Sequence, residues 1–183
     1  MSCADHAAAL DAESFEAETF EAFYERTRDG LWRYLRRVGG DASLAEDLVQ
    51  ESYLRFLRQG RLHPDPRQRT AYLYTIATNL LRDRWRRGKR ERDSALLEPR
   101  RPPETLGSNG LVADLSAALD ALSQRDRALL WLAYVEGYDH REIADVLDLA
   151  STSVRVLLFR ARKRAAEILR RRGWDSEKTE TTS

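Results

Sequence analysis

The sequence contains few of the residues from which covalent or metal-held frameworks are built. Cys3 is the only cysteine among 183 residues, so no disulfide can form within the chain and no set of cysteine ligands can hold zinc. No apolar run approaches the ~18 residues that a membrane helix needs, and the start lacks the basic and apolar segments of a signal peptide. We therefore expect a cytoplasmic protein with no membrane segment.

The motifs of common enzyme and cofactor sites are also missing. The sequence holds no phosphate-binding glycine loop, no HExxH pair and no cysteine and histidine set with the spacing of metal ligands. Neighbouring acids such as Glu46 and Asp47 are explained as surface residues of a helix. The sequence thus predicts neither catalysis nor a metal or other cofactor.

Charge is abundant but unevenly distributed. Charged residues make up 33% of the chain, yet the formal net charge is only +1. Residues 1–25 contain acids and no lysine or arginine, whereas seven of the eleven residues at 82–92 are basic. Any electrostatic function must therefore come from local surfaces, and such a basic stretch favours contact with nucleic acid. The alternative is a basic helix end that only complements the helix dipole.

Prolines and apolar spacing divide the chain into helical segments. All five prolines fall between segments with helical apolar spacing, and no alternating strand pattern competes with them. Residues 94–113 hold three prolines and two glycines with little periodicity, which is typical of a linker. We predict an all-α protein with two small helical domains joined by a flexible linker. The expected parts are a flexible acidic N-terminus (1–12), a first domain (13–93), the linker (94–113), a second domain (114–174) and a disordered tail (175–183).

The first domain is expected to contain three helices around one core. An acidic helix runs from about Ser14 past Gly30, a capping box of Ser43 and Glu46 opens the second helix, and the third spans 70–87 or more. The inward residues of the second helix are Leu44, Leu48, Val49, Ser52 and Phe56, and those of the third are Leu73, Ile76, Ala77, Leu80 and Leu81.

The second domain is expected to contain four helices, the first a short one at 115–122. The residues expected at the other boundaries are Ser123 with Asp126, Gly137 in the C′ position, Asp139 with Glu142, and Ser151 at the start of the last helix. The apolar members of that helix are Val154, Leu157, Leu158, Ala161, Ala165, Ile168 and Leu169.

The segments REIADVL, DLA and STSVRVLLFRARKR have the layout of a helix-turn-helix at 141–164. Asp148 stands where the commonest form of the motif has glycine, and aspartate tolerates left-handed backbone better than most residues. The alternative is an αα-hairpin with a solvated basic face. The residues expected to meet base edges in the major groove are Ser151, Thr152, Ser153 and Arg155, and those expected on phosphates are Arg160, Arg162, Lys163 and Arg164.

The third helix, whose end is basic, carries a second candidate surface for nucleic acid. Asn79 and Asp83 lie one turn apart, and Tyr72 and Trp85 offer aromatic rings near the arginines. Rings among cations suit single strands, whose bases stack while their phosphates meet guanidinium groups. Trp85 could equally belong to the core.

Both halves resemble a known family. DASLAEDLVQESYLRFLR (41–58) and AYLYTIATNLLRDRWRR (71–87) resemble conserved region 2 of bacterial RNA polymerase sigma factors. LDALSQRDRALLWLAYVEGYDHREIADVL (119–147) and SVRVLLFRARKR (153–164) resemble region 4. Because no domain lies between them, the chain resembles the extracytoplasmic-function (ECF) subfamily of the sigma-70 family. The resemblance implies a protein that binds core RNA polymerase, recognises the minus-10 and minus-35 promoter elements and promotes DNA melting and transcription initiation.

The resemblance also implies roles for individual residues. Asp47, Gln50 and Glu51 match the face that binds the β′ clamp helices of the polymerase, although the residues alone would also fit a solvated helix surface. The loop at 60–68 matches the one that captures a flipped base. The implied minus-10 residues are Asn79, Arg82, Asp83, Arg86 and, in that loop, His63.

Val156 and Leu157 depart from the pattern of many relatives, which have a small residue and an arginine there, so one expected phosphate contact is missing. The implied partners are the polymerase core, through the β′ clamp helices and the β flap, promoter DNA and an anti-sigma factor, with no membrane. Two alternatives stay open. One is a freestanding dimeric helix-turn-helix regulator, and the other is a sigma mimic that occupies an anti-sigma factor.

Overall fold

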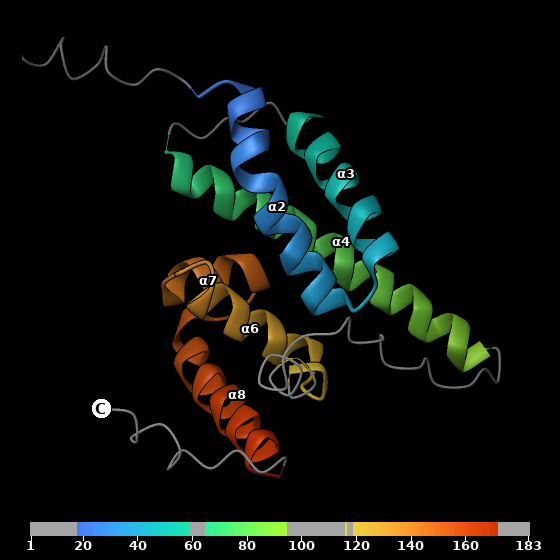
Figure 1. The fold of residues 1–183 in the computed structure, drawn as a ribbon, viewed down its shortest axis with the longest axis vertical. Helices are drawn as coiled ribbons and strands as arrows, with labels where there is room; N and C mark the ends of the chain where they lie inside the picture. The colour runs from blue at the N-terminus through green and yellow to red at the C-terminus, as the bar shows by residue number, and fades with distance from the viewer. Residues whose placement is uncertain (1–17, 59–64, 95–115, 117–118, 172–183) are drawn as a thin grey trace, which may run out of the picture.

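The computed structural model describes residues 18–58, 65–94, 116 and 119–171. Within these ranges the protein forms six helices and no strand, which confirms the all-α prediction (Figure 1). No described helix is both long and apolar enough to span a bilayer. The expected N-terminal segment, the tail and nearly all of the linker lie outside the described residues.

Helix α2 (Phe20–Gly39) begins later than the sequence predicted. The Thr19 hydroxyl accepts a hydrogen bond from the Ala22 N–H at 3.2 Å, so Thr19 is the N-cap and the expected start near Ser14 is wrong. The helix continues past Gly30, as predicted.

Helix α3 (Ala42–Arg58) has a different cap from the one predicted. Gly40 has a φ of +82°, a left-handed conformation that ends α2 and leaves Asp41 at the start of the next helix. The Asp41 carboxylate accepts a hydrogen bond from the Leu44 N–H at 2.9 Å. The capping box expected to start at Ser43 is therefore wrong, because the helix is already formed at that residue.

Helix α4 (Pro66–Ser94) begins before the predicted Thr70 and extends past Arg87, as predicted. The Asp65 carboxylate accepts a hydrogen bond from the Arg67 N–H at 2.9 Å. Pro66 takes the first helical position, where its missing N–H leaves no hydrogen bond unmade.

The remaining helices are α6 (Gln124–Tyr134), α7 (His140–Leu147) and α8 (Ser151–Arg171). The Ser123 hydroxyl accepts a hydrogen bond from the Asp126 N–H at 3.1 Å, which confirms the predicted cap of α6. That helix ends at Tyr134, and Gly137 has the left-handed φ of +66° in the bend that follows. The short helix expected at 115–122 lies partly outside the described residues; residues 116, 119 and 120 are helical.

Helices α2, α3 and α4 pack around apolar and aromatic side chains. Phe23 of α2 stacks on Phe56 of α3 with ring centroids 5.0 Å apart, and the hydroxyls of Thr27 and Tyr53 share a hydrogen bond of 2.7 Å. The inward residues predicted for α3 and α4 are buried, except for the partly buried Leu44. The apolar periodicity of these helices was therefore a correct guide to their inner faces.

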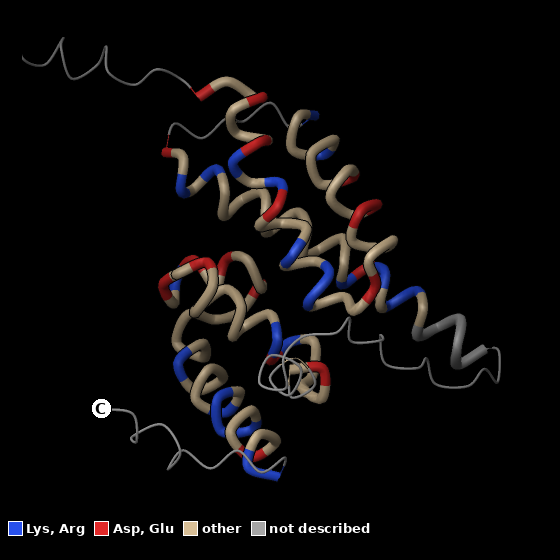
Figure 2. Tube along the Cα trace, viewed as in Figure 1, with Lys and Arg blue, Asp and Glu red and all other residues tan. Residues whose placement is uncertain are grey.

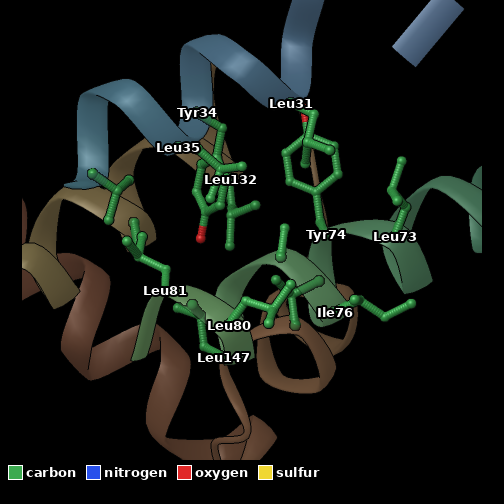
Figure 3. Close-up of a cluster of buried hydrophobic side chains, with 14 of the residues drawn as sticks. Leu31, Tyr34, Leu35, Leu73, Tyr74, Ile76, Leu80, Leu81, Leu132 and Leu147 are labelled. Atoms are coloured by element: carbon green, nitrogen blue, oxygen red, sulfur yellow. The ribbon is translucent and has the colours of Figure 1, made fainter. Parts of the chain in front are cut away.

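The first group of helices (α2, α3 and α4) and the second group (α6, α7 and α8) also pack against each other. The sequence did not predict this contact. Helix α7 lies against α4, and α6 lies against α2 (Figure 1). Leu132 of α6 and Leu147 of α7 are buried in the same apolar cluster as Leu35, Leu80 and Leu81 (Figure 3). The described parts of the chain thus share one core.

Candidate nucleic-acid interface

Helix α7, the first helix of the predicted helix-turn-helix, is fixed at its start by a reciprocal capping box. The Asp139 carboxylate accepts hydrogen bonds from the N–H groups of Arg141 (2.7 Å) and Glu142 (2.9 Å), and Glu142 Oε2 accepts one from the Asp139 N–H at 2.7 Å. The hydrogen bond from the Glu142 backbone is the main reason that the pKa of Asp139 lies below its usual value. Because eight residues form no stable helix alone, this cap and the buried Ile143 and Val146 together hold α7 in place.

The turn of the motif at 148–150 has the conformation that the sequence predicted. Asp148 has φ +51° and ψ +58°, so an aspartate does adopt the left-handed backbone for which glycine is common. The Leu149 N–H donates a hydrogen bond to the Ala144 carbonyl at 2.9 Å, which satisfies a carbonyl at the end of α7. Helix α8 then begins at Ser151, as expected.

One face of α8 is buried and the opposite face is exposed. Val154, Leu158 and Ala161 recur at helical spacing and are buried in the second group of helices. This burial fixes how α8 is rotated about its axis. The four residues predicted to meet base edges are all exposed in the first turns: Ser151, Thr152, Ser153 and Arg155.

Lysine and arginine positions recur along α8 after these turns (Figure 2), and the predicted phosphate contacts are among them. Arg160, Arg162 and Lys163 are all exposed. The Arg162 guanidinium also donates a hydrogen bond to the Tyr134 hydroxyl at 3.2 Å, so its position is partly set by the end of α6. These three cations remain accessible to a phosphate backbone.

Arg164 has a structural contact that the sequence analysis did not foresee. Its guanidinium donates two hydrogen bonds to the Asp126 carboxylate, at 2.8 and 2.6 Å. Asp126 is only 4% exposed, and a buried carboxylate needs such a partner to offset its lost hydration. Arg164 therefore fastens α8 to α6, and the phosphate role expected of it is not supported.

The minus-10 residues predicted on α4 differ in how accessible they are. Asn79 is exposed, and the side chains of Asp83 and Arg86 are 50% and 64% exposed and form an ion pair at 4.0 Å. His63 lies outside the described residues. Trp85 is partly buried and packs against the core, which agrees with the alternative that this ring belongs to the core.

Arg82, the fifth predicted minus-10 residue, is bonded to the helix-turn-helix. Its guanidinium donates a hydrogen bond to the Leu147 carbonyl at 2.6 Å, where α7 ends. The same group lies 3.8 Å from the Asp148 carboxylate and donates to Asn79 Oδ1 at 3.4 Å. Arg82, a residue of the first domain that was predicted to contact DNA, is thus hydrogen-bonded to the helix-turn-helix of the second domain.

Arg67 makes a second charged contact between the two groups. Its guanidinium donates to both carboxylate oxygens of Glu142, with Nη2 to Oε2 at 2.9 Å, and to the Gly137 carbonyl at 2.9 Å. This hydrogen bonding is the main reason that the pKa of Glu142 lies below its usual value. Glu142 therefore both caps α7 and joins it to α4.

A third arginine joins the end of α2 to the start of the second group. The Arg37 guanidinium donates to the hydroxyl of Ser116 at 2.9 Å and to its carbonyl at 3.1 Å. It also lies 3.5 Å from the Asp120 carboxylate, which Arg127 approaches to 3.4 Å. Burial is the main reason that the pKa values of both guanidinium groups are lowered.

The predicted polymerase-binding residues lie on the outer face of α3. Asp47 and Gln50 are exposed, and Glu51 is partly exposed and receives a hydrogen bond from Arg55 at 2.7 Å. Two neighbours on the same helix, Leu54 and Leu57, were not predicted as part of this face and are 48% and 49% exposed. Their spacing of three residues places both leucines on one side of the helix beside the acidic signature, and this spacing was the available signal.

Comparison with known proteins identifies both groups of helices. Residues 23–91 match the family described as Sigma-70 region 2, and residues 113–164 match Sigma-70, region 4. The ECF RNA polymerase sigma factor SigL of Mycobacterium tuberculosis is 34% identical over 160 residues, which cover 82% of this chain and 88% of SigL. The ECF RNA polymerase sigma factor SigE of Mycolicibacterium smegmatis is 33% identical over 149 residues, covering 77% of this chain and 58% of SigE.

A solved structure has the same fold. The sigma factor RpoE of Bartonella quintana, in its co-crystal with the anti-sigma factor NepR, superposes with a TM-score of 0.67 at 23% identity, covering 82% of this chain and 96% of RpoE. Two helical domains of these types, in this order, define a sigma-70 protein that contains regions 2 and 4. With the identity to SigL over most of both chains, this protein belongs to the family of ECF RNA polymerase sigma factors.

Proposed function

We propose that this protein is a promoter-specificity subunit that directs core RNA polymerase to its start sites. The observation that carries the proposal is the presence of both sigma regions, at 23–91 and 113–164, with the outer face of the recognition helix open to solvent. The protein would perform no reaction itself, because phosphodiester chemistry belongs to the polymerase. Its place of work would be the cytoplasm, where polymerase and DNA meet.

Helix α8 would read the minus-35 element from the major groove. Ser151, Thr152, Ser153 and Arg155 offer hydroxyl and guanidinium groups, which pair with base edges. The exposed Arg160, Arg162 and Lys163 would bind phosphates, and such contacts set the position on DNA and add affinity without reading sequence.

Helix α4 would bind the melted minus-10 element. Exposed Asn79 would hydrogen-bond a base of the non-template strand, while Asp83 and Arg86 lie beside it. Arg82 and His63 complete the proposed set. Because flipping a base costs a few kcal/mol of stacking and pairing, the protein must return that energy through contacts to the displaced strand.

The outer face of α3 would bind the β′ clamp helices of the polymerase, and the second domain would contact the β flap. Asp47, Gln50 and Glu51 provide the polar contacts, and we add Leu54 and Leu57 as apolar contacts. The buried centre of an interface is more apolar than its polar, solvent-accessible rim. A ridge with both kinds of residue fits this requirement better than its acids alone.

The contact between the domains would hold the free protein in a closed form. The Arg82 guanidinium donates to the Leu147 carbonyl and its side chain is only 29% exposed, so in this form it would be less available to a phosphate. Binding to core polymerase would pull the domains apart and release Arg82. The net charge of only +1 also fits a protein that would depend on a partner to bind DNA well.

An anti-sigma factor is the further partner that we propose. RpoE of Bartonella quintana, similar in fold, was crystallised in complex with the anti-sigma factor NepR. A partner of this kind would compete with polymerase for the exposed apolar side chains of α3 and for the cations of α8.

Run-off transcription with purified core polymerase and a library of genomic promoters tests the proposed function. We expect defined transcripts only when both the core enzyme and this protein are present, and weak promoter binding by the protein alone. Polymerase without the protein is the control. Equal promoter affinity with and without core enzyme would contradict the proposal and favour a freestanding regulator.

One observation favours a second candidate, a sigma mimic. The anti-anti-sigma factor PhyR of Bartonella quintana, in complex with NepR, matches this fold with a TM-score of 0.50 at 16% identity, over 81% of this chain and 50% of PhyR. The fold alone therefore does not separate the two functions. The same run-off assay does, because a mimic would give no transcript, and the exposed Asn79 and basic α8 favour the sigma factor.

A further inference from the structure

We infer that Val156 reads DNA sequence by contacting the 5-methyl group of a thymine in the minus-35 element. The inference rests on the proposed function, since it requires α8 to enter the major groove. It deepens that function by assigning one base type to one side chain. Val156 is not among the residues expected to meet bases, which were chosen for their hydrogen-bonding groups.

The rotation of α8 places Val156 on its outermost side. Val154, Leu158 and Ala161 are buried and mark the inner face. Each residue turns the helix by about 100°, so Val156 lies about 200° from Val154 and points away from the core. Its side chain is 49% exposed, and Thr152, one turn before it, is exposed too.

Val156 lies among polar and cationic side chains. Arg155 precedes it, and Arg160 follows one turn later, both exposed. Of the described residues of α8, Val156 and Phe159 are the exposed large apolar ones. A surface that otherwise suits phosphates and base edges therefore has an apolar centre close to the end that would enter the groove.

The fold gives no reason for a valine at this position. Its side chain is too exposed to stabilise the core, and a β-branched residue is less favourable on a helix surface than alanine, lysine or glutamate. An exposed apolar residue is common by itself, but this one stands in the middle of the proposed reading face.

The major groove offers such a residue one apolar partner among the base edges. Each base pair presents hydrogen-bond donors and acceptors there, and the 5-methyl group of thymine is the apolar exception. Valine has no atom that can bind a phosphate or a donor. Val156 therefore gains free energy in the groove when its methyl groups pack against a thymine methyl and lose contact with water.

Deoxyuridine provides the test, because it pairs like thymidine but lacks the methyl group. On the strongest promoter from the run-off assay, each thymine of the upstream element is replaced singly by deoxyuridine, and holoenzyme binding and initiation are measured. We expect the wild-type holoenzyme to lose about fourfold at one position, from the burial of one methyl-sized group. With Val156→Ser, the ratio between the thymine and deoxyuridine promoters at that position should fall to about one.

Val135→Ser is the matched control, because Val135 is a 59% exposed valine at the end of α6, outside the proposed reading face. It should leave the thymine preference unchanged, and thermal melting will check that both variants fold. An equal thymine preference in wild type and Val156→Ser, or a uniform loss on every template, would overturn the inference while leaving the proposed function intact. Absence of all promoter-directed transcription would overturn both.

Discussion

At the scale of single residues, Asp148 carries the backbone strain of the helix-turn-helix. Among the described residues it is the one non-glycine residue with a positive φ, at +51°. Its side chain is 87% exposed and lies 3.8 Å from the Arg82 guanidinium, a separation at which an exposed pair adds little stability. The aspartate is therefore kept in the turn at a small conformational cost that glycine would avoid.

Substitutions at Asp148 should separate backbone strain from side-chain contact. We expect Asp148→Gly to raise the free energy of unfolding by up to about 1 kcal/mol, because glycine adopts left-handed backbone without a steric penalty. Asp148→Ala should lower it by about 1 kcal/mol, because a Cβ without a polar group has no compensation there. Urea unfolding of both variants checks this, and greater stability of the alanine variant would refute it.

At the scale of helices, local residue chemistry predicted some boundaries and missed others. The caps at Ser123 and Asp139 were predicted correctly, because each is the one good capping residue directly before an apolar-periodic segment. Before α3, Asp41 and Ser43 are both good caps. Gly40, in the left-handed conformation, ends α2 and leaves Asp41 directly before α3. Asp41 therefore caps α3, and Ser43 lies inside the helix. Such a choice depends on how α2 ends, which the capping pattern does not contain.

The stability of α7 should depend on its capping box. Asp139→Ala removes the acceptor for the N–H groups of Arg141 and Glu142, so we expect a loss of about 1 kcal/mol in the free energy of unfolding. Asp139→Ser is the matched control, since serine also caps helices and should retain most of that stability. Urea denaturation followed by circular dichroism measures both, and equal losses would show that the cap contributes nothing specific.

At the scale of the whole molecule, the sequence predicted the faces but not the contact between them. The inward faces of α3 and α4 and the exposed face of α8 follow from apolar periodicity. The meeting of Leu132 and Leu147 with Leu35 does not, because periodicity shows that a side chain is buried and not what it is buried against. The bonds of Arg67 and Arg82 could not be predicted either, since an arginine expected to contact DNA, as Arg82 was, looks the same in sequence as one bound to a carbonyl.

Acid should weaken the contact between the domains. Arg67 lowers the pKa of Glu142 below its ordinary value of 4.5, so the folded, closed protein favours the charged carboxylate. A carboxylate with a lowered pKa contributes its full stabilisation above that ordinary value and loses it as the pH falls through the lowered one. At neutral pH the contact is therefore at full strength, and its opening must come from a partner and not from protonation.

Arg67→Ala tests whether charged contacts hold the closed form. The variant loses the bonds to Glu142 and the Gly137 carbonyl, so we expect a larger radius of gyration by small-angle scattering and stronger promoter binding without polymerase. Arg28→Ala is the matched control, because it removes the same charge from an exposed arginine whose pair is Asp29 of its own helix. If the radius of gyration and promoter binding stay the same in both variants, charged contacts do not hold the closed form. The apolar cluster around Leu132 and Leu147 then holds it, and polymerase must separate these buried leucines to release Arg82.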